Sequence, residues 1–255
     1  MKLPALFIGH GSPMLALEAG PYTEAWAQLA SEMPRPRAIL AISAHWFTQG
    51  LGVTAMEAPR TIHDFYGFPP ALYELRYPAP GDPALAQRLA TLLAPASVVA
   101  DQEWGLDHGT WAVLRYMYPQ ADIPVVQLSL DASLTAQAHY ALGQLLAPLR
   151  ADGVLVLGSG NVVHNLRLMS RSETAATPAW ASEFNAAVRS AILSGKHEQL
   201  IQYPELPGAQ RAVPTPEHYL PLLYALAVRA ADEPLSIPID GLEYAAISMM
   251  CVKVG

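Results

Sequence analysis

The stretch Leu3-Pro4-Ala5-Leu6-Phe7-Ile8-Gly9-His10-Gly11-Ser12-Pro13 opens the chain with a short apolar run that stops abruptly at glycine and histidine. Similar runs, each ending in small or polar residues, follow at Ala38 to Ile42, Ile123 to Leu130 and Val154 to Leu157. Their length and β-branched content favour buried strands over helices. The sequence therefore predicts a set of buried strands spread over the first two thirds of the chain.

Helical patterns lie between and after these strands. They cover Tyr22 to Met33, Ala84 to Leu93, Leu134 to Leu149, Trp180 to Leu193 and Glu217 to Ala230. Strands that alternate with helices indicate an α/β fold around a mostly parallel central sheet flanked by helices. No linker or charge block interrupts the pattern, so we expect a single domain over residues 1–255.

The C-terminal segment has a different pattern. Leu235 to Ile239 and Leu242 to Val254 are apolar runs separated by Asp240-Gly241. Asp-Gly between apolar runs is a hairpin signal. We expect an antiparallel C-terminal hairpin at an edge of the sheet.

Composition excludes several classes of function. Hydrophobic residues make up 52% of the chain, and the formal net charge is −7, which argues against a nucleic-acid surface. No stretch is long and apolar enough to span a bilayer. Cys251 is the only cysteine, so an internal disulfide is excluded and we expect a cytoplasmic protein with an inert buried thiol. Oligomeric state is not readable from the sequence.

Three histidines lie at or just after the ends of predicted strands. His10 and His45 follow the first two strands directly, and His164 follows the loop Gly158-Ser159-Gly160-Asn161. In open α/β sheets, ligands bind beyond the carboxyl ends of the strands. These three imidazoles are therefore expected at one rim of the sheet, although each residue alone is more often structural than functional.

Other histidines have weaker local signals. His218 follows Thr215 and Pro216, a plausible N-cap and first helical residue, which would place His218 in the first turn of a helix. His108 lies among glycines and tryptophans that suggest a pocket wall, and His63 lies in a loop that could cover a site. We expect His139 and His197 to be surface residues.

No spacing matches a named metal motif. The sequence contains no H-E-x-x-H, paired C-x-x-C or EF-hand loop. Gly158-Ser159-Gly160 lacks the G-x-S-x-G spacing of a nucleophile elbow. From the residues alone, the prediction is an α/β protein with a candidate multi-histidine site.

Several segments, taken together and in order, resemble a known family. They are Leu6 to Met14 (LFIGHGSPM), Ser43 to Trp46 (SAHW), Trp104 to Gly109 (WGLDHG), Ser159 to Asn165 (SGNVVHN) and Thr215 to Pro221 (TPEHYLP). They closely resemble the class III extradiol ring-cleavage dioxygenases of the LigB-type superfamily, and within it the bacterial 4,5-DOPA-extradiol-dioxygenase-like branch. The resemblance extends from Pro4 to Val254.

The resemblance implies one α/β domain with a single divalent metal, iron(II) in the active enzyme. It places His10, His45 and His218 at metal-ligand positions. It places His164 at the position of an acid/base that is also a candidate metal ligand, and His108 at a position that contacts substrate or oxygen. Other superfamily members carry a glutamate as third ligand, whereas the matching position here is His218, so the site departs from the two-histidine, one-carboxylate pattern.

The function implied is cleavage of a substituted catechol such as L-DOPA, with O₂, between carbons 4 and 5 to a semialdehyde muconate-type product. Candidate walls for the flat ring are Trp46, Phe65, Tyr66, Phe68 and Trp111. Arg60, Arg76 and Arg211 could bind a substrate carboxylate.

Two alternatives remain open. A three-histidine site also suits zinc, so zinc could occupy it and the chain could be a zinc hydrolase. Some superfamily members, the Memo-type proteins, keep the fold but act as binding or redox-signalling modules.

Overall fold

A computed structural model describes residues 2–170, 172 and 175–255. Its main feature is an eight-stranded sheet with the order β4-β3-β5-β2-β6-β1-β10-β7. The strands are β1 (Ala5–Gly9), β2 (Ala38–Thr48), β3 (Leu51–Thr54), β4 (Val98–Asp101), β5 (Val125–Asp131), β6 (Val154–Gly160), β7 (Leu235–Ile239) and β10 (Cys251–Val254). A small second sheet contains β8 (Leu242–Glu243) and β9 (Ile247–Ser248).

The four central strands, β5, β2, β6 and β1, are parallel. They are the four strands predicted from the apolar runs, and each of them is almost wholly buried. Strands buried on both faces read as continuous apolar runs, which is why the sequence revealed them. Strands β3 and β10 join this core antiparallel to β5 and β1 respectively, so the α/β, mostly parallel prediction is confirmed.

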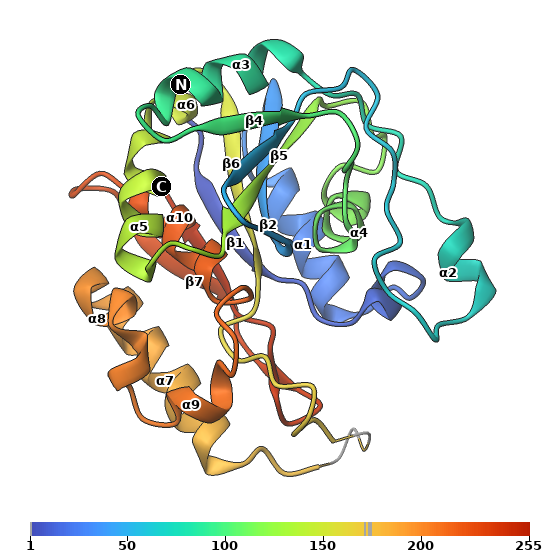
Figure 1. The fold of residues 1–255 in the computed structure, drawn as a ribbon. Coiled ribbons are helices and arrows are strands. Elements are labelled where there is room, and N and C mark those ends of the chain that lie inside the picture. Colours follow the sequence, from blue (N-terminus) through green and yellow to red (C-terminus); the bar gives the residue numbers. More distant parts are fainter. Residues whose placement is uncertain (1, 171, 173–174) are drawn as a thin grey trace.

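Helices cover both faces of the sheet. Figure 1 shows α5 and α10 on one side and α1 and α4 on the other. Alternate residues of β1 follow this division: Ala5 and Phe7 belong to the core under α10, and Leu6 and Ile8 to the core under α1. The helices are α1 (Pro21–Ser31), α2 (Pro70–Glu74), α3 (Pro83–Leu92), α4 (His108–Met117), α5 (Ala136–Leu145), α6 (Pro148–Ala151), α7 (Ala179–Leu193), α8 (His197–Ile201), α9 (Ala209–Ala212) and α10 (Leu220–Ala227), with 3-10 turns at Pro13–Ala16 and Tyr203–Glu205.

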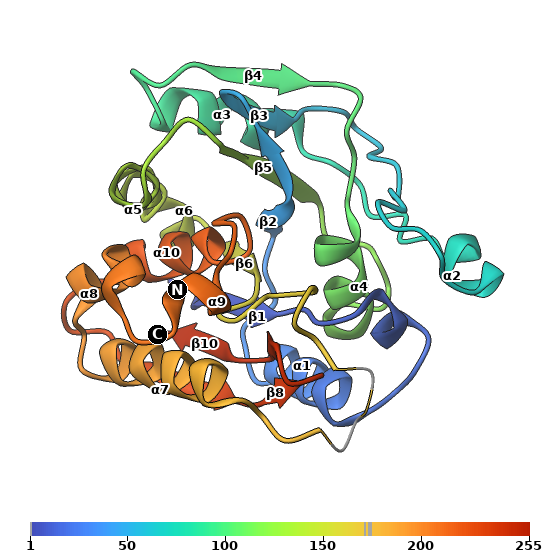
Figure 2. The same ribbon diagram turned by 60° about the horizontal axis from the view of Figure 1, so that its bottom comes forward.

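The C-terminal prediction is confirmed, with a different turn. Strand β7 pairs antiparallel with β10 and forms one edge of the sheet, opposite β4. Figure 2 shows β10 and β4 far apart, toward opposite ends of the sheet. Strands β8 and β9 form a hairpin between them, whose turn lies at Tyr244 and Ala245, both with positive φ. The tight turn is therefore not at Asp240-Gly241.

The start of the last predicted helix is wrong. Helix α10 begins at Leu220, not at Glu217. Residues 216–219 form a separate turn, in which Tyr219 N donates to Pro216 O, and the Thr215 hydroxyl donates to the Glu217 side chain instead of capping a helix. His218 therefore precedes the helix. None of the helices in the described ranges is long and apolar enough to cross a membrane.

Candidate metal centre

The strand order brings the predicted histidines together. Strand β6 lies between β1 and β2, so the carboxyl ends of these three strands are neighbours. His10 follows β1 directly, and His164 follows β6 in a loop. His45 lies within β2 rather than after it, in the stretch between Ile42 and Phe47 where the pairing of β2 with β5 shifts register. In this irregular stretch the His45 ring lies against the other imidazoles.

His218 reaches the same point because the turn before α10 packs tightly on β6. The backbone of Asn161 donates to the His218 carbonyl at 2.8 Å. A Cβ on Gly160 would lie 2.1 Å from that carbonyl oxygen, so only glycine permits this approach. The backbone of β6 thus holds His218 in place.

Three imidazoles converge. The Nε2 atoms of His10 and His45 are 3.1 Å apart. The His218 ring centroid lies 5.5 Å from that of His10 and 5.1 Å from that of His45. One ring nitrogen from each of the three lies within 4.8 Å of the others, which makes this set a group that could hold a metal ion.

The second nitrogen of each ring faces an oxygen that can accept a hydrogen bond from it. The Ser159 hydroxyl donates to the Gly109 carbonyl at 2.5 Å, so it accepts from His10 Nδ1 at 3.0 Å. His218 Nδ1 lies 3.3 Å from a Glu217 carboxylate oxygen, and His45 Nδ1 lies 3.3 Å from one of Asp64. With the proton on each Nδ1, all three Nε2 lone pairs are left free, as in protein metal sites.

These residues fit a divalent cation. Two unprotonated Nε2 atoms 3.1 Å apart repel each other unless a cation lies between them. Nitrogens about 2.1 Å from one cation are separated by roughly 3.0–3.4 Å for bond angles near 90–110°. His218 Nε2 is buried and has no hydrogen-bond partner among the described residues. An unpartnered buried nitrogen costs free energy, which a metal bond would offset.

The protonation state of the three histidines also favours metal binding. Burial and the neighbouring imidazoles hold the pKa values of His10 and His218 well below the ordinary value of 6.5. Burial and the adjacent His108 do the same for the pKa of His45, against the opposing pull of Asp64. Neutral imidazole is the form that binds metal, so at neutral pH no proton has to leave before binding.

His164 lies beside the three rather than among them. Its ring stacks on that of His218, with centroids 3.5 Å apart and planes 7° from parallel. Burial lowers the pKa of His164 to about 4, so it is a free base at neutral pH. The sequence left open whether His164 is a ligand or a base. Its ring nitrogens do not belong to the group of three that lie within 4.8 Å of one another.

His108 completes the cluster from the first residue of α4. Its ring centroid is 3.9 Å from that of His45, and its Nδ1 lies 2.9 Å from Asp64. The preceding residue, Asp107, caps α4, accepts a hydrogen bond from Ser43 of β2 and contacts Gln127 of β5. Burial, reinforced by the Asp64 charge, raises the pKa of Asp107 to about 6. This buried network ties the start of α4 to the sheet.

A cavity of about 570 Å³ opens over the imidazoles. Apart from the histidines and Asp64, its lining is mostly apolar: Gly11, Ser12, Pro13, Phe65, Tyr66, Phe68, Leu166, Met169, Tyr244 and Ile247. Among the predicted ring walls, Phe65, Tyr66 and Phe68 line it. Trp46 and Trp111 do not, because Trp46 stacks on Trp104 and Trp111 is fully buried in the core.

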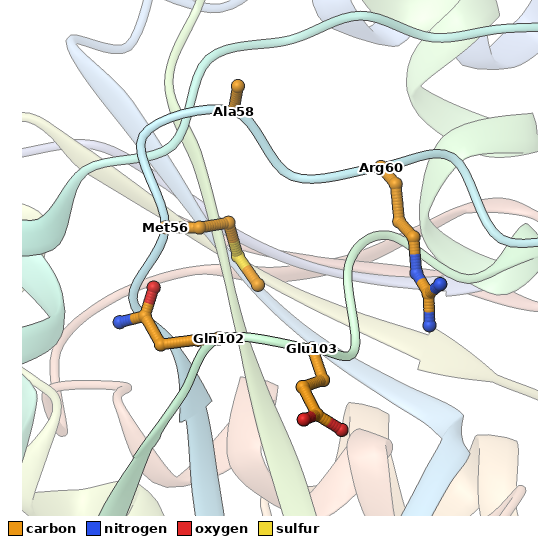
Figure 3. Close-up of a pocket in the computed structure, with 5 residues that line it drawn as sticks. All are labelled: Met56, Ala58, Arg60, Gln102 and Glu103. Carbon is orange, nitrogen blue, oxygen red and sulfur yellow. The ribbon is translucent and has the colours of Figure 1, made fainter.

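The predicted carboxylate-binding arginines do not line this cavity. Arg60 lines a separate hollow with Met56, Ala58, Gln102 and Glu103, whose side chains are drawn in Figure 3. Arg76 donates to the carbonyls of Tyr73 and Leu75, and Arg211 lines a surface hollow beside Trp180.

Three other histidines have structural roles. The prediction that His139 is a surface residue is wrong, because it is fully buried between the Tyr224 hydroxyl and the Asp131 carbonyl. His197 is half-buried and forms a hydrogen bond with the Tyr140 hydroxyl. His63 forms a hydrogen bond with the Leu75 carbonyl. It does not line the cavity, whereas residues that follow it in the same loop, from Asp64 to Phe68, do.

Sequence reasoning missed the residues behind the imidazoles, namely Asp64, Ser159 and Glu217. Each is adjacent to or inside a segment already singled out, but an acceptor for a histidine proton has no local pattern of its own. The only sequence feature that could have indicated them is the presence of a hydroxyl or carboxylate side chain in or beside a segment that contains a histidine.

Comparisons with known proteins agree with this geometry. Residues 4–254 match the family described as the catalytic LigB subunit of aromatic ring-opening dioxygenase. The chain is 53% identical over 258 residues to the 4,5-DOPA dioxygenase extradiol of Escherichia coli (strain K12), covering 100% of this chain and 95% of that protein. It is 42% identical to the 4,5-DOPA dioxygenase extradiol of Beta vulgaris, covering 86% of this chain and 84% of that protein.

A solved structure shares the fold. The crystal structure of an uncharacterised protein from Escherichia coli K12 superimposes with a TM-score of 0.89 at 47% identity, over 100% of both chains. The chain therefore belongs to the LigB family, the class III extradiol dioxygenases.

Proposed function

We propose that this extradiol dioxygenase depends on iron(II) and cleaves a substituted catechol such as L-DOPA between carbons 4 and 5. The observation that carries the proposal is the convergence of three imidazole nitrogens, each freed by an acceptor behind its ring, at the floor of an apolar cavity. Relatives from Escherichia coli and Beta vulgaris named 4,5-DOPA dioxygenase extradiol support the choice of substrate.

His10, His45 and His218 would hold the metal. Three neutral imidazoles add no charge, so a divalent cation keeps its 2+ charge and suits a catecholate dianion. When bound, iron(II) would lower the pKa values of the catechol hydroxyls and supply the electron transfer that lets O₂ react with the ring. The remaining chemistry is the placement of protons and of the ring, which the protein's own side chains provide.

His164 and His108 are the proton carriers in this proposal. His164 is a free base at neutral pH, because burial lowers its pKa to about 4, and it lines the cavity. It can accept the proton that a catechol hydroxyl loses. His108 Nδ1 faces Asp64, so its Nε2 is the ring atom available to a ligand in the cavity. His108 contacts substrate or oxygen there, and once its Nε2 has accepted a proton the ring, paired with Asp64, stabilises developing negative charge.

The aromatic part of the lining positions the ring. Phe65 and Phe68 pack edge to face at 5.3 Å, and Phe65 also meets the His108 ring at 5.5 Å. Ile247 and Met169 add apolar surface to the cavity. A flat catechol between such walls displaces water from the reacting carbons and keeps its diol edge toward the imidazoles.

The test is aerobic turnover of L-DOPA by protein loaded anaerobically with iron(II). We expect a yellow product only when air is admitted, and none from the His10→Ala variant. Turnover that continues without O₂ would instead support a zinc hydrolase on the same ligands. No reaction of freshly iron-loaded protein with any catechol would favour a Memo-type binding protein.

A further inference from the structure

Asp64 touches two imidazoles with different expected roles. One carboxylate oxygen accepts from the His108 backbone N–H at 2.9 Å, and the other from His108 Nδ1 at 2.9 Å. The second oxygen also lies 3.3 Å from His45 Nδ1. The side chain is 14% exposed, so water competes little for these contacts.

The position of Asp64 is set by the backbone around it. Ile62 N donates to Leu106 O at 2.7 Å, and Leu106 N donates to Arg60 O at 2.8 Å, which binds this loop to the segment before α4. Trp111 Nε1 of α4 donates to Ile62 O at 2.8 Å. The carboxylate is thus held at the N-terminus of a ten-residue helix, where the helix dipole favours negative charge.

An ionised carboxylate can only accept hydrogen bonds, so it decides which nitrogen of each ring carries the proton. A neutral imidazole otherwise has two tautomers, and the protein must select one of them. A proton on His45 Nε2 would block metal binding. A proton on His108 Nε2 would present a donor to the cavity instead of an acceptor.

We propose that Asp64 is a positioning residue that holds His45 and His108 in the same tautomer, with both Nε2 lone pairs available. One carboxylate thereby sets the proton position both of a metal ligand, His45, and of His108, the imidazole that faces the substrate. This inference rests on the proposed function for the roles of the two histidines. The three proposed metal ligands include no carboxylate, but the Asp64 carboxylate contacts the ligand His45 from the side away from the metal position.

The acceptors of the other two ligands differ from Asp64. Ser159 serves His10, and Glu217 serves His218. Within the part of the chain that the structure describes, each of these partners contacts a single ring of the cluster. Glu217→Gln is therefore a control that disturbs one metal ligand and leaves His108 unaffected.

The change to test is Asp64→Asn, which keeps the size of the side chain. An amide has one accepting oxygen and one donating nitrogen, so it cannot serve both the His108 backbone N–H and the two rings: when its oxygen accepts from the backbone, its nitrogen faces both rings as a donor. A matched control is Asp131→Asn. Asp131 is also a buried carboxylate, but it accepts from Gly50 N and Ser133 N, and it does not line the cavity.

The readouts are zinc affinity and ring protonation, measured on zinc-loaded protein labelled with ¹⁵N at histidine. In the wild type, long-range ¹H–¹⁵N spectra should show His45 and His108 both protonated at Nδ1. Asp64→Asn should bind zinc roughly 10- to 100-fold more weakly and move the His108 proton to Nε2. Asp131→Asn should keep the wild-type zinc affinity, and Glu217→Gln should weaken zinc binding without changing His108.

A wild-type spectrum with either ring protonated at Nε2 alone would overturn the proposal, even if Asp64→Asn failed to fold. Unchanged zinc affinity in a folded Asp64→Asn protein would overturn it as well. With iron(II) and a catechol, Asp64→Asn should lose kcat more than it raises KM. If the wild type turned over no catechol, the proposed function would fail while the zinc and tautomer measurements still tested Asp64.

Discussion

Gly160→Ala should weaken metal binding although Gly160 supplies no ligand. The added Cβ would lie 2.1 Å from the His218 carbonyl oxygen and 3.1 Å from the carbonyl carbon. Non-bonded carbon and oxygen atoms rarely approach closer than about 3.0 Å, so one of the two backbones must move by roughly 1 Å. Both belong to the site, because β6 carries Gly160 and the opposing turn carries His218.

The size of the effect follows from that displacement. Metal–ligand distances tolerate about 0.2 Å of error, and a misplacement of about 1 Å in a catalytic site can cost roughly 100-fold. At a zinc concentration 1,000 times the wild-type Kd, zinc stabilises the wild type by about 4.1 kcal/mol. With a Kd about 100-fold higher, the same zinc would stabilise the variant by about 1.4 kcal/mol. Overpacking should also lower the stability of the metal-free variant by about 1–3 kcal/mol.

The assay is chemical unfolding with and without zinc, together with direct zinc titration. Gly20→Ala is the matched control, because a Cβ on Gly20 meets nothing within 4 Å and its φ of −164° is ordinary extended backbone. It should show the full zinc stabilisation. A folded Gly160→Ala protein with wild-type zinc affinity would refute the claim that β6 positions His218.

Three further predictions concern single histidines. His10→Ala should remove the zinc-dependent gain in stability, and a gain equal to that of the wild type in unfolding experiments would exclude His10 as a ligand. His164→Ala should bind zinc within a few-fold of the wild type but lose turnover with iron(II), since its ring stacks on His218 outside the three converging nitrogens; a large loss of zinc affinity would instead make it a ligand. His139→Gln should remove part of the acid sensitivity of folding. Burial lowers the pKa of His139 from 6.5 to about 4 in the folded protein, so the unfolded chain takes up the proton first as pH falls. The stabilisation is complete above pH 6.5 and decreases toward pH 4, with about 1.4 kcal/mol lost by pH 5.5. Equal pH profiles of stability for variant and wild type would contradict it.

The pattern of apolar runs was enough to predict the parallel core. Strands β1, β2, β5 and β6 are buried on both faces, and such strands leave uninterrupted apolar sequence. Strand β4 was missed because its apolar run, Val98 to Ala100, is only three residues long, and the strand lies at the sheet edge with every position half-buried or exposed. Helix α4 was missed because its N-terminal glycine and histidine read as a loop.

The sequence by itself also determined which imidazoles to consider. His10, His45 and His164 could be placed near strand ends, since the end of a strand is a local property, and the family resemblance singled out His218 and His108. Their convergence was decided by the tertiary structure. It depends on β6 lying between β1 and β2, and on the turn before α10 packing against Gly160, and neither contact is encoded in a short window of sequence.

The same distinction explains His139 and Asp64. His139 looks like a surface residue in its helix. Its burial is tolerated because the Tyr224 hydroxyl, which is distant in sequence, and the Asp131 carbonyl satisfy both ring nitrogens. Asp64 acquires its role only when its loop is hydrogen-bonded to the segment before α4. Local sequence determines which residues prefer strands, turns or burial. The pairing of charges, lone pairs and protons depends on distances across the fold, which only the folded chain sets.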